Sequence, residues 1–228
     1  MQRINADFTR RAVVHVADQP WVPSPTAGVE RRMLDRVGDE VARATSIVRY
    51  APGSAFPAHT HGGGEEYFVL EGVFQDEEGD HPVGTYVRNP PTTRHTPGSQ
   101  PGCTIFVKLW QFDPDDRQSA RVATAGMPAQ DDQQRPGVAV IELHADAHEC
   151  VRIEHWAAER VLELKASDGM ELLVLEGSFS GGDESFLPWS WLRLPAADHL
   201  QVRVGAEGAR VWVKRGVQPA SLRLPPDA

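Results

Sequence analysis

Cysteine is scarce in this chain of 228 residues, which contains only Cys103 and Cys150. The two cysteines fall in different halves of the sequence, so their spacing suggests no disulfide framework. A free cysteine usually behaves as a small buried apolar residue. We therefore expect both thiols to be reduced and buried.

A long apolar run is also absent, and so is a leader with basic, apolar and small-residue regions. A membrane-spanning helix would need about 18 or more consecutive apolar residues. Basic residues are outnumbered, 23 against 32 acidic residues, which gives a net charge of -9. This charge disfavours nucleic acid and anionic membranes as partners. The sequence thus predicts a soluble cytoplasmic protein with no nucleic-acid partner and no membrane partner.

Sustained helical periodicity is missing, although residues 33–44 (MLDRVGDEVARA) could form a turn of helix. Short apolar stretches alternate instead with glycine and proline. In residues 103–109 (CTIFVKL) every second residue is apolar on one face, which is typical of a strand. Many short strands at close spacing predict an all-β protein. The polar segment 113–137 is expected to connect two halves.

A repeated signature supports two halves. Residues 69–74 read VLEGVF and residues 174–179 read VLEGSF, an offset of 105 residues. Residues 84–95 and 189–199 repeat a turn, a strand, a proline and a histidine in the same order. Two copies of one β-domain explain this pattern most simply. We assign residues 1–125 to a first domain and residues 126–228 to a second.

Three potential metal ligands lie together in the first half. His59, His61 and Glu65 share one face if their segment is extended, because side chains two and four positions apart point the same way. His95 follows a later turn that could bring it to them. Three imidazoles and one carboxylate suit Zn, Fe(II), Mn, Co, Ni or Cu. An octahedral ion held by four ligands keeps two positions open for a substrate or for dioxygen.

Two simpler explanations of these residues are weaker than metal binding. A His-x-His pair on a strand is often only two exposed polar residues, but Glu65 and His95 at matching spacing make that explanation weak. Residues 61–64 (HGGG) echo the oxyanion loop of some esterases. That activity also requires a Gly-x-Ser-x-Gly nucleophile elbow, which the sequence lacks. The histidines are therefore better explained as metal ligands.

The spacing of these residues resembles the two motifs of the cupin superfamily. Gly53, His59, His61, Glu65 and Gly72 match the first motif. The second motif is matched by Gly84, Pro90 and His95, with Thr92 and Ser99 standing where the family usually has glycine and asparagine. The resemblance implies that each half is a double-stranded β-helix, the RmlC-like jelly roll. It also implies one divalent metal ion bound by His59, His61, Glu65 and His95.

Residues 44–111 resemble most closely the cupin domain of ChrR-type anti-sigma factors and their stand-alone relatives. In that family a helical zinc-binding domain, built on histidines and cysteines, holds the sigma factor. This sequence begins MQRINADFTRR and has no cysteine before Cys103. We therefore do not expect it to sequester a sigma factor.

The second copy lacks most of the ligands. With the 105-residue offset, Leu164, Ala166 and Met170 replace the first three, and His199 alone matches His95. We expect a degenerate, metal-free domain in which these apolar residues pack inside and line no polar cavity. Its tryptophans are expected to fill space. His144, His148, Cys150 and His155 are not expected to form a zinc site, and His81 with the acidic run 76–80 should occupy a solvated hairpin turn.

These features favour a metal-dependent enzyme of the oxygenase type acting on a small molecule. A ChrR-like sensing module is the alternative, and a non-catalytic binding protein is a third hypothesis. Tyr67, on the ligand face, and Glu66 beside it are candidates for proton transfer. The two domains are expected to pair as an intrachain pseudo-dimer, with residues 1–40 adding strands to a sheet edge and a homodimer left open.

Overall fold

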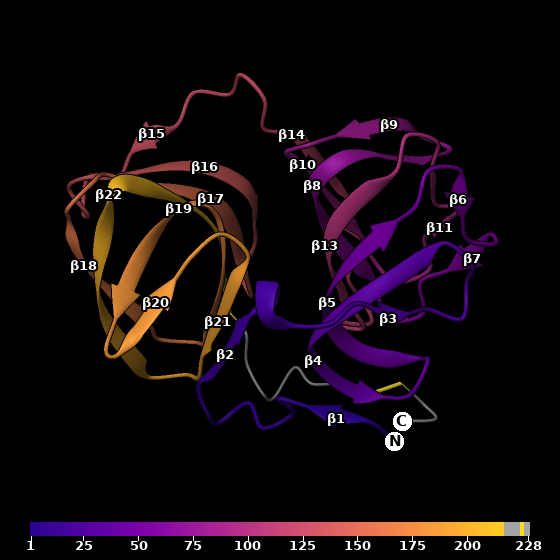
Figure 1. The fold of residues 1–228 in the computed structure, drawn as a ribbon, viewed down its shortest axis with the longest axis horizontal. Coiled ribbons are helices and arrows are strands. Elements are labelled where there is room, and N and C mark those ends of the chain that lie inside the picture. Colours follow the sequence, from indigo (N-terminus) through magenta and orange to yellow (C-terminus); the bar gives the residue numbers. More distant parts are fainter. Residues whose placement is uncertain (217–223, 226–228) are drawn as a thin grey trace. The chain divides into compact units, whose positions relative to one another are not determined.

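The computed structural model describes residues 1–216 and 224–225, and its regular secondary structure is almost all β-strand (Figure 1). The expected all-β class is confirmed. Residues 33–44 form no helix, because they span the hairpin between Val29–Gly38 and Ala42–Tyr50. Gly38, with a φ of 122°, reverses the chain there.

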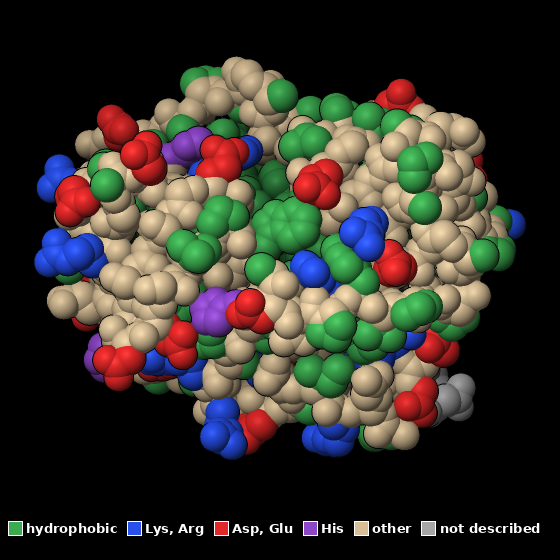
Figure 2. Space-filling model, in the orientation of Figure 1, with side chains coloured by type: hydrophobic (Ala, Val, Ile, Leu, Met, Phe, Trp, Pro, Cys, Tyr) green, Lys and Arg blue, Asp and Glu red, His purple; other side chains and the backbone are tan. Residues whose placement is uncertain are grey.

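Among the described residues no helix is long and apolar enough to cross a membrane. Acidic and basic side chains are interspersed on the face drawn in Figure 2.

The chain divides into two compact units. Of the described residues, unit 1 contains Met1–Ala6, Pro20–Gly126 and 224–225, and unit 2 contains Asp7–Gln19 and 127–216. The sequence predicts a first domain of residues 1–125. In the structure, however, Asp7–Gln19 belong to unit 2, because their strand hydrogen-bonds there.

Unit 1 is built on an antiparallel sheet of order β1-β4-β5-β13-β8-β10-β14, which β3, β6, β9 and β12 extend, while β7 pairs with β11. Its strands are β1 (Arg3–Ile4), β3 (Val22–Pro23), β4 (Val29–Gly38), β5 (Ala42–Tyr50), β6 (Ser54–Ala55), β7 (His59–Thr60), β8 (Glu65–Asp76), β9 (Gly79–Pro82), β10 (Thr85–Asn89), β11 (Arg94–His95), β12 (Gly98–Ser99), β13 (Cys103–Leu109) and β14 (Ala120–Ala123). Its core includes Tyr67, Val69, Phe74, Ile105 and Val107.

Unit 2 has the order β15-β16-β17-β22-β19-β21-β2, with β18 paired to β22 and β20 to β19. Its elements are β2 (Ala12–His15), the 3-10 helix η1 (Val16–Asp18), β15 (Gln130–Asp131), β16 (Val138–Ala145), β17 (Cys150–Trp156), β18 (Val161–Ala166), β19 (Met170–Gly181), β20 (Glu184–Phe186), β21 (Ser190–Leu194) and β22 (Asp198–Arg215). Its core packs Leu164, Ala166 and Met170 with Trp156 and Phe179. The expected burial of the three replacement residues is confirmed.

The repeat predicted from the sequence is present in the strand register. Strand β8 has a bulge after Val69 in its pairing with β13. Strand β19 has the same bulge after Val174, 105 residues later in the sequence, in its pairing with β22. Gly72 and Gly177 follow these bulges with φ values of 69° and 68°. Both units therefore share one backbone design at the signature.

The strands that precede the two halves, β2 and β14, occupy equivalent edge positions in the two sheets. Strand β2 pairs with β21 in unit 2, and β14 pairs with β10 in unit 1. Strands β10 and β21 are equivalent, because Tyr86 lies opposite Phe68 and Trp191 lies opposite Leu173. In the chain, however, β2 precedes the first half and β14 precedes the second. Strand β2 thus adds to the sheet of unit 2, and β14 adds to the sheet of unit 1. Strands from residues 1–40 extend sheet edges, as expected.

The thiols differ in burial. Cys103 is buried, and burial raises its pKa to about 11, so it stays a protonated thiol in the core. Cys150 is free but only half-buried, so the expectation of burial is wrong for it. It lies at the start of β17, where β16 and β22 flank it.

The signature glycine gives a stability prediction. A Cβ at Gly177 would lie 2.1 Å from the carbonyl oxygen of Gly208, whereas a Cβ at Gly182 would meet nothing within 4 Å. Both glycines have a positive φ, 68° and 60°, so the backbone strain of an alanine is similar. We expect Gly177→Ala to lower the free energy of unfolding by about 1–3 kcal/mol more than Gly182→Ala. Equal denaturation midpoints for the two variants would show that the close approach is not required.

Candidate metal centre

Strand pairing brings the four predicted ligands of unit 1 together. His59 on β7 lies directly opposite His95 on β11. The backbone N–H of His61 donates to the carbonyl of Thr93 at 2.9 Å, which extends this pairing by one residue. Glu65 is the first residue of β8. One potential ligand atom from each of the four side chains lies within 4.8 Å of the others.

Three of the facing atoms make no hydrogen bond to any residue that the structure describes. Nε2 of His61, Nε2 of His95 and Oε1 of Glu65 are all buried and accept or donate no hydrogen bond. Oε1 of Glu65 lies 3.6 Å from Nε2 of His61 and 3.4 Å from Nε2 of His95. Buried polar atoms without partners are costly, and a metal ion is the usual reason for several to converge. The donor set and its burial therefore fit one divalent metal ion.

A hydrogen bond at the other ring nitrogen orients each histidine. Nδ1 of His59 lies 3.0 Å from the carbonyl oxygen of Pro57, and Nδ1 of His61 lies 2.9 Å from Oγ1 of Thr93. The Thr93 hydroxyl donates its own proton to the carbonyl of Pro90 at 2.7 Å, so it must accept from His61. Both rings thus carry their proton on Nδ1, and Nε2 presents a lone pair to the metal.

Asp76 performs this task for His95. One carboxylate oxygen of Asp76 lies 3.3 Å from Nδ1 of His95, and the other lies 2.9 Å from Nε2 of His81. The side chain of Asp76 is only 2% exposed, and His81 is buried. The prediction of a solvated turn is therefore wrong for these two residues. Asp76 lies two positions after the core residue Phe74, and His81 lies opposite Phe74, so strand alternation places both inside.

The pKa values reflect this arrangement. Burial would raise the pKa of Asp76, but hydrogen bonds from His81 and His95 outweigh it and hold the pKa well below its ordinary value. Burial lowers the pKa of His61, with Glu65 opposing. For His95 burial also acts downward, but the hydrogen bond to Asp76 and the charge of Glu65 outweigh it and raise the pKa. Asp76 is therefore an anion that supports the His95 ring.

The sequence departures from the family motifs have local effects. Thr92 adopts a φ of 78°, in the region that glycine occupies most easily, and its N–H donates to the carbonyl of His61 at 2.9 Å. The Ser99 hydroxyl donates to the carbonyl of Val73 at 2.6 Å. Both substitutions therefore keep the turn that carries His95. Gly62 and Gly63 lie against Trp110, whose ring would clash with a Cβ at Gly63, and Gly64 lies against Phe112.

The two candidate proton-transfer residues lie on opposite faces of β8. Tyr67 is 1% exposed in the interior core, and its hydroxyl has no hydrogen-bond partner. Burial raises its pKa well above the ordinary value, with Asp76 and Glu65 adding to the effect. Glu66 accepts a hydrogen bond of 2.7 Å from the Tyr86 hydroxyl on the other face. Strand alternation therefore removes Glu66 from the site, which corrects the prediction for that residue.

A pocket of ≈ 690 Å³ adjoins the centre. It borders Asp76, Thr93 and His95 together with Arg94 and Arg121. It thus reaches the ligand His95 and two residues, Asp76 and Thr93, that orient the ligand histidines. Within the described residues the four predicted ligands of unit 1 are the one group of histidine and acidic residues close enough together to hold a metal ion.

Comparison with known proteins agrees with this geometry. A family model described as the ChrR Cupin-like domain matches residues 9–113. An acetylacetone-cleaving enzyme from Acinetobacter johnsonii is 28% identical over 116 residues, which cover 49% of this chain and 75% of that enzyme.

Solved structures resemble the whole chain more distantly. A proposed dioxygenase from Nostoc punctiforme has a TM-score of 0.73 at 15% identity, covering 96% of this chain and 84% of its own. A bacterial pirin from Escherichia coli in complex with nickel(II) has a TM-score of 0.63 at 12% identity, covering 90% and 99%. A cupin 2 conserved barrel protein from Leptotrichia buccalis has a TM-score of 0.58 at 13% identity, covering 85% and 91%. The jelly-roll fold expected from the sequence is thereby confirmed.

The role of Asp76 can be tested by charge removal. Asp76→Asn keeps the size of the side chain but removes the anion that supports His95, and we expect the affinity for Zn²⁺ or Ni²⁺ to fall about 10- to 100-fold. Asp80→Asn, on the exposed hairpin, is the matched control and should bind as the parent does. Competition with a chromogenic chelator measures both affinities. Equal affinities for the parent and Asp76→Asn would refute the supporting role.

Proposed function

Because residues 9–113 belong to the ChrR cupin-like domains of the cupin superfamily, we propose that this chain is a metal-dependent enzyme of the oxygenase type. The observation that carries the proposal is the convergence of three imidazoles and one carboxylate, of which all but the half-buried His59 are buried: His59, His61, Glu65 and His95. Four protein ligands leave two positions of an octahedral ion for other molecules, unlike a closed structural zinc site.

We infer a substrate that carries two oxygen atoms, either on neighbouring carbon atoms, as in an enediol, or on carbon atoms separated by one carbon, as in a β-dicarbonyl. Such a molecule can occupy two open positions of one ion. The relative from Acinetobacter johnsonii is named for cleaving acetylacetone, a β-dicarbonyl, which supports this class. Fe(II) is our choice of native metal, ahead of Zn, Mn, Ni or Co. When bound, Fe(II) supplies Lewis acidity and the ability to react with dioxygen.

The protein side chains have separate tasks in this proposal. Pro57, Thr93 and Asp76 hold the Nδ1 protons of the three histidines, so the Nε2 lone pairs stay directed at the metal. Tyr67 keeps its phenolic proton because its pKa is raised. Its hydroxyl, free of partners in the interior, would donate a hydrogen bond to negative charge that develops on the substrate. The apolar core around Tyr67 keeps water away from the reacting atoms.

Oxygen consumption tests the enzyme directly. Full-length protein loaded with Fe(II) should consume O₂ when acetylacetone is added, and the rate should rise with enzyme concentration. Tyr67→Phe should keep its iron but lose activity roughly 100-fold, because a hydrogen bond to developing charge is removed. Tyr86→Phe, whose hydroxyl contacts Glu66 on the other face of β8, is the matched control and should remain active.

Two results would oppose the proposal. Full iron occupancy without O₂ consumption, across acetylacetone and related dicarbonyls and enediols, would favour the alternative of a ChrR-like sensing module. Unchanged activity of Tyr67→Phe would remove Tyr67 from the reaction. The match of residues 9–113 to the ChrR cupin-like domain is the observation that keeps the sensing alternative in view. The cellular compartment, the intrachain pseudo-dimer and a homodimer stay predictions.

A further inference from the structure

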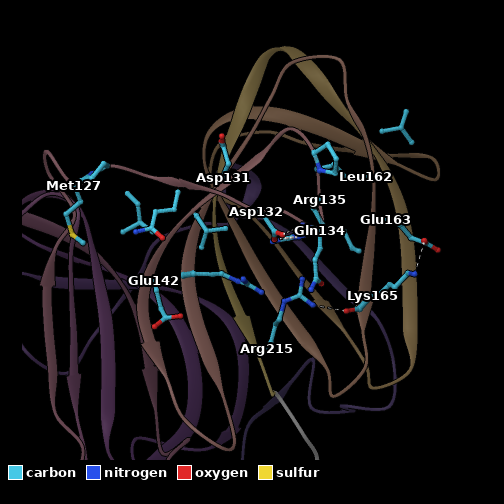
Figure 3. Close-up of a pocket in the computed structure, with 18 residues that line it drawn as sticks. Met127, Asp131, Asp132, Gln134, Arg135, Glu142, Leu162, Glu163, Lys165 and Arg215 are labelled. Carbon is cyan, nitrogen blue, oxygen red and sulfur yellow. Dashed lines mark hydrogen bonds and ion pairs between the residues drawn. The ribbon is translucent and has the colours of Figure 1, made fainter.

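Unit 2 contains a pocket of its own, of ≈ 1080 Å³, where the sequence predicted only a filled interior (Figure 3). Its wall is formed by the segment around β15, by β16 and β17, by β18 and by the end of β22. Leu164, the counterpart of the ligand His59, borders it. The expectation that no replacement residue lines a polar cavity is therefore wrong for Leu164, because arginines project into the same space.

The arginines come from strands that face the barrel interior. Arg152 on β17 and Arg215 on β22 lie an even number of positions from core residues. Arg152 is four positions before Trp156, and Arg215 is two positions after Val213. Side chains an even number of positions apart on a strand share a face. Arg135 enters from the segment after β15, and Figure 3 shows it beside Arg215 in the middle of the pocket.

The charged side chain of one cross-strand pair lies on different strands in the two units. In unit 1 the ligand Glu65 lies opposite Leu109. In unit 2 the equivalent pair is Met170 opposite Arg215. The acidic ligand has become apolar, and its apolar neighbour has become a guanidinium. Unit 1 is suited to a metal cation at this position, whereas unit 2 has the guanidinium of Arg215 in the equivalent strand pair.

Arg135 is occupied by protein partners. It makes two bonds of 2.8 Å to the two carboxylate oxygens of Glu154 and a third of 2.8 Å to Asp132. Glu154 is 1% exposed and also accepts a bond from the Trp156 indole. The paired carboxylate of Glu154 and the Arg135 guanidinium therefore largely neutralise each other.

Arg215 has a spare donor, because its Nε is buried and makes no hydrogen bond to a described residue. Nε of Arg152 also makes no hydrogen bond, but it forms an ion pair of 3.1 Å with Oε1 of Glu154. Arg215 donates through Nη1 to the carbonyl of Lys165 at 3.0 Å. Burial lowers the pKa of Arg215, with Arg152 and Arg135 acting in the same direction against Glu154. Of the acids that line the pocket, Asp131, Glu142 and Glu163 are exposed.

We propose that this pocket binds a small organic anion, with its carboxylate held by Arg215 and Arg152 and a short apolar body against Leu162 and Leu164. A guanidinium fork matches a carboxylate in geometry and charge, and a bound carboxylate supplies an acceptor for the buried Nε of Arg215. The apolar residues of the wall favour a ligand with a few carbons over an inorganic ion. The pocket lies within unit 2, so the proposal does not depend on the metal or on the reaction in unit 1.

Calorimetric titration of the full-length protein tests this, with butanoate, acetate and inorganic phosphate as separate probes. We expect butanoate to bind more tightly than acetate and phosphate. Arg215→Gln should weaken butanoate binding at least tenfold. Arg203→Gln is the matched control, since Arg203 is exposed on the same strand outside the pocket. His95→Ala should bind butanoate as the parent does, which separates this site from the metal centre.

A second measurement uses the unaltered protein, in case Arg215→Gln fails to fold. Phenylglyoxal modification mapped by peptide mass spectrometry should slow at Arg215 and Arg152 in the presence of butanoate, with no change at Arg203. Parental butanoate affinity in folded Arg215→Gln would overturn the proposal. So would loss of butanoate binding in His95→Ala, a preference for phosphate, or the absence of protection at both arginines.

Discussion

The candidate metal centre depends on one kind of hydrogen bond, in which the Nδ1 proton of a histidine is held by an oxygen atom. Pro57, Thr93 and Asp76 provide these oxygens for His59, His61 and His95. In a neutral ring that carries its proton on Nδ1, Nε2 carries a lone pair. The strands β7, β8 and β11 direct these lone pairs, with the Glu65 carboxylate, at one buried position. Without the second hydrogen bond a ring could rotate or change tautomer, and the site would lose its donor.

The two units show how one backbone can carry different chemistry. The bulges after Val69 and Val174, and the glycines that follow them, keep the strands of both barrels in the same register. The scaffold is therefore independent of the metal. In unit 2 the apolar core extends across the former ligand positions, while charged residues occupy the facing wall on β17 and β22. Loss of the metal ligands has not made the second interior uniformly apolar.

Strand alternation and the repeat allowed much of this to be predicted from the sequence. The all-β class, the jelly-roll fold and the proximity of His59, His61, Glu65 and His95 followed from local spacing and the family resemblance. Asp76 and His81 were missed, because an acidic hairpin suggested solvent, although Phe74 two positions earlier was part of the repeated core signature. The exchange of β2 and β14 and the partnership of Arg135 with Glu154 depend on contacts between distant segments. No local pattern contains that information.

Metal content per chain tests the central claim most directly, because the two barrels share a scaffold and differ in their ligands. Elemental analysis of the full-length protein, after loading with excess Zn²⁺ or Ni²⁺ and removal of unbound ion, should give one equivalent per chain. His95→Ala should lose that ion, because one of four donors is removed, whereas His199→Ala, at the matching position of unit 2, should retain it. Two equivalents in the parent, or full retention in His95→Ala, would contradict the account.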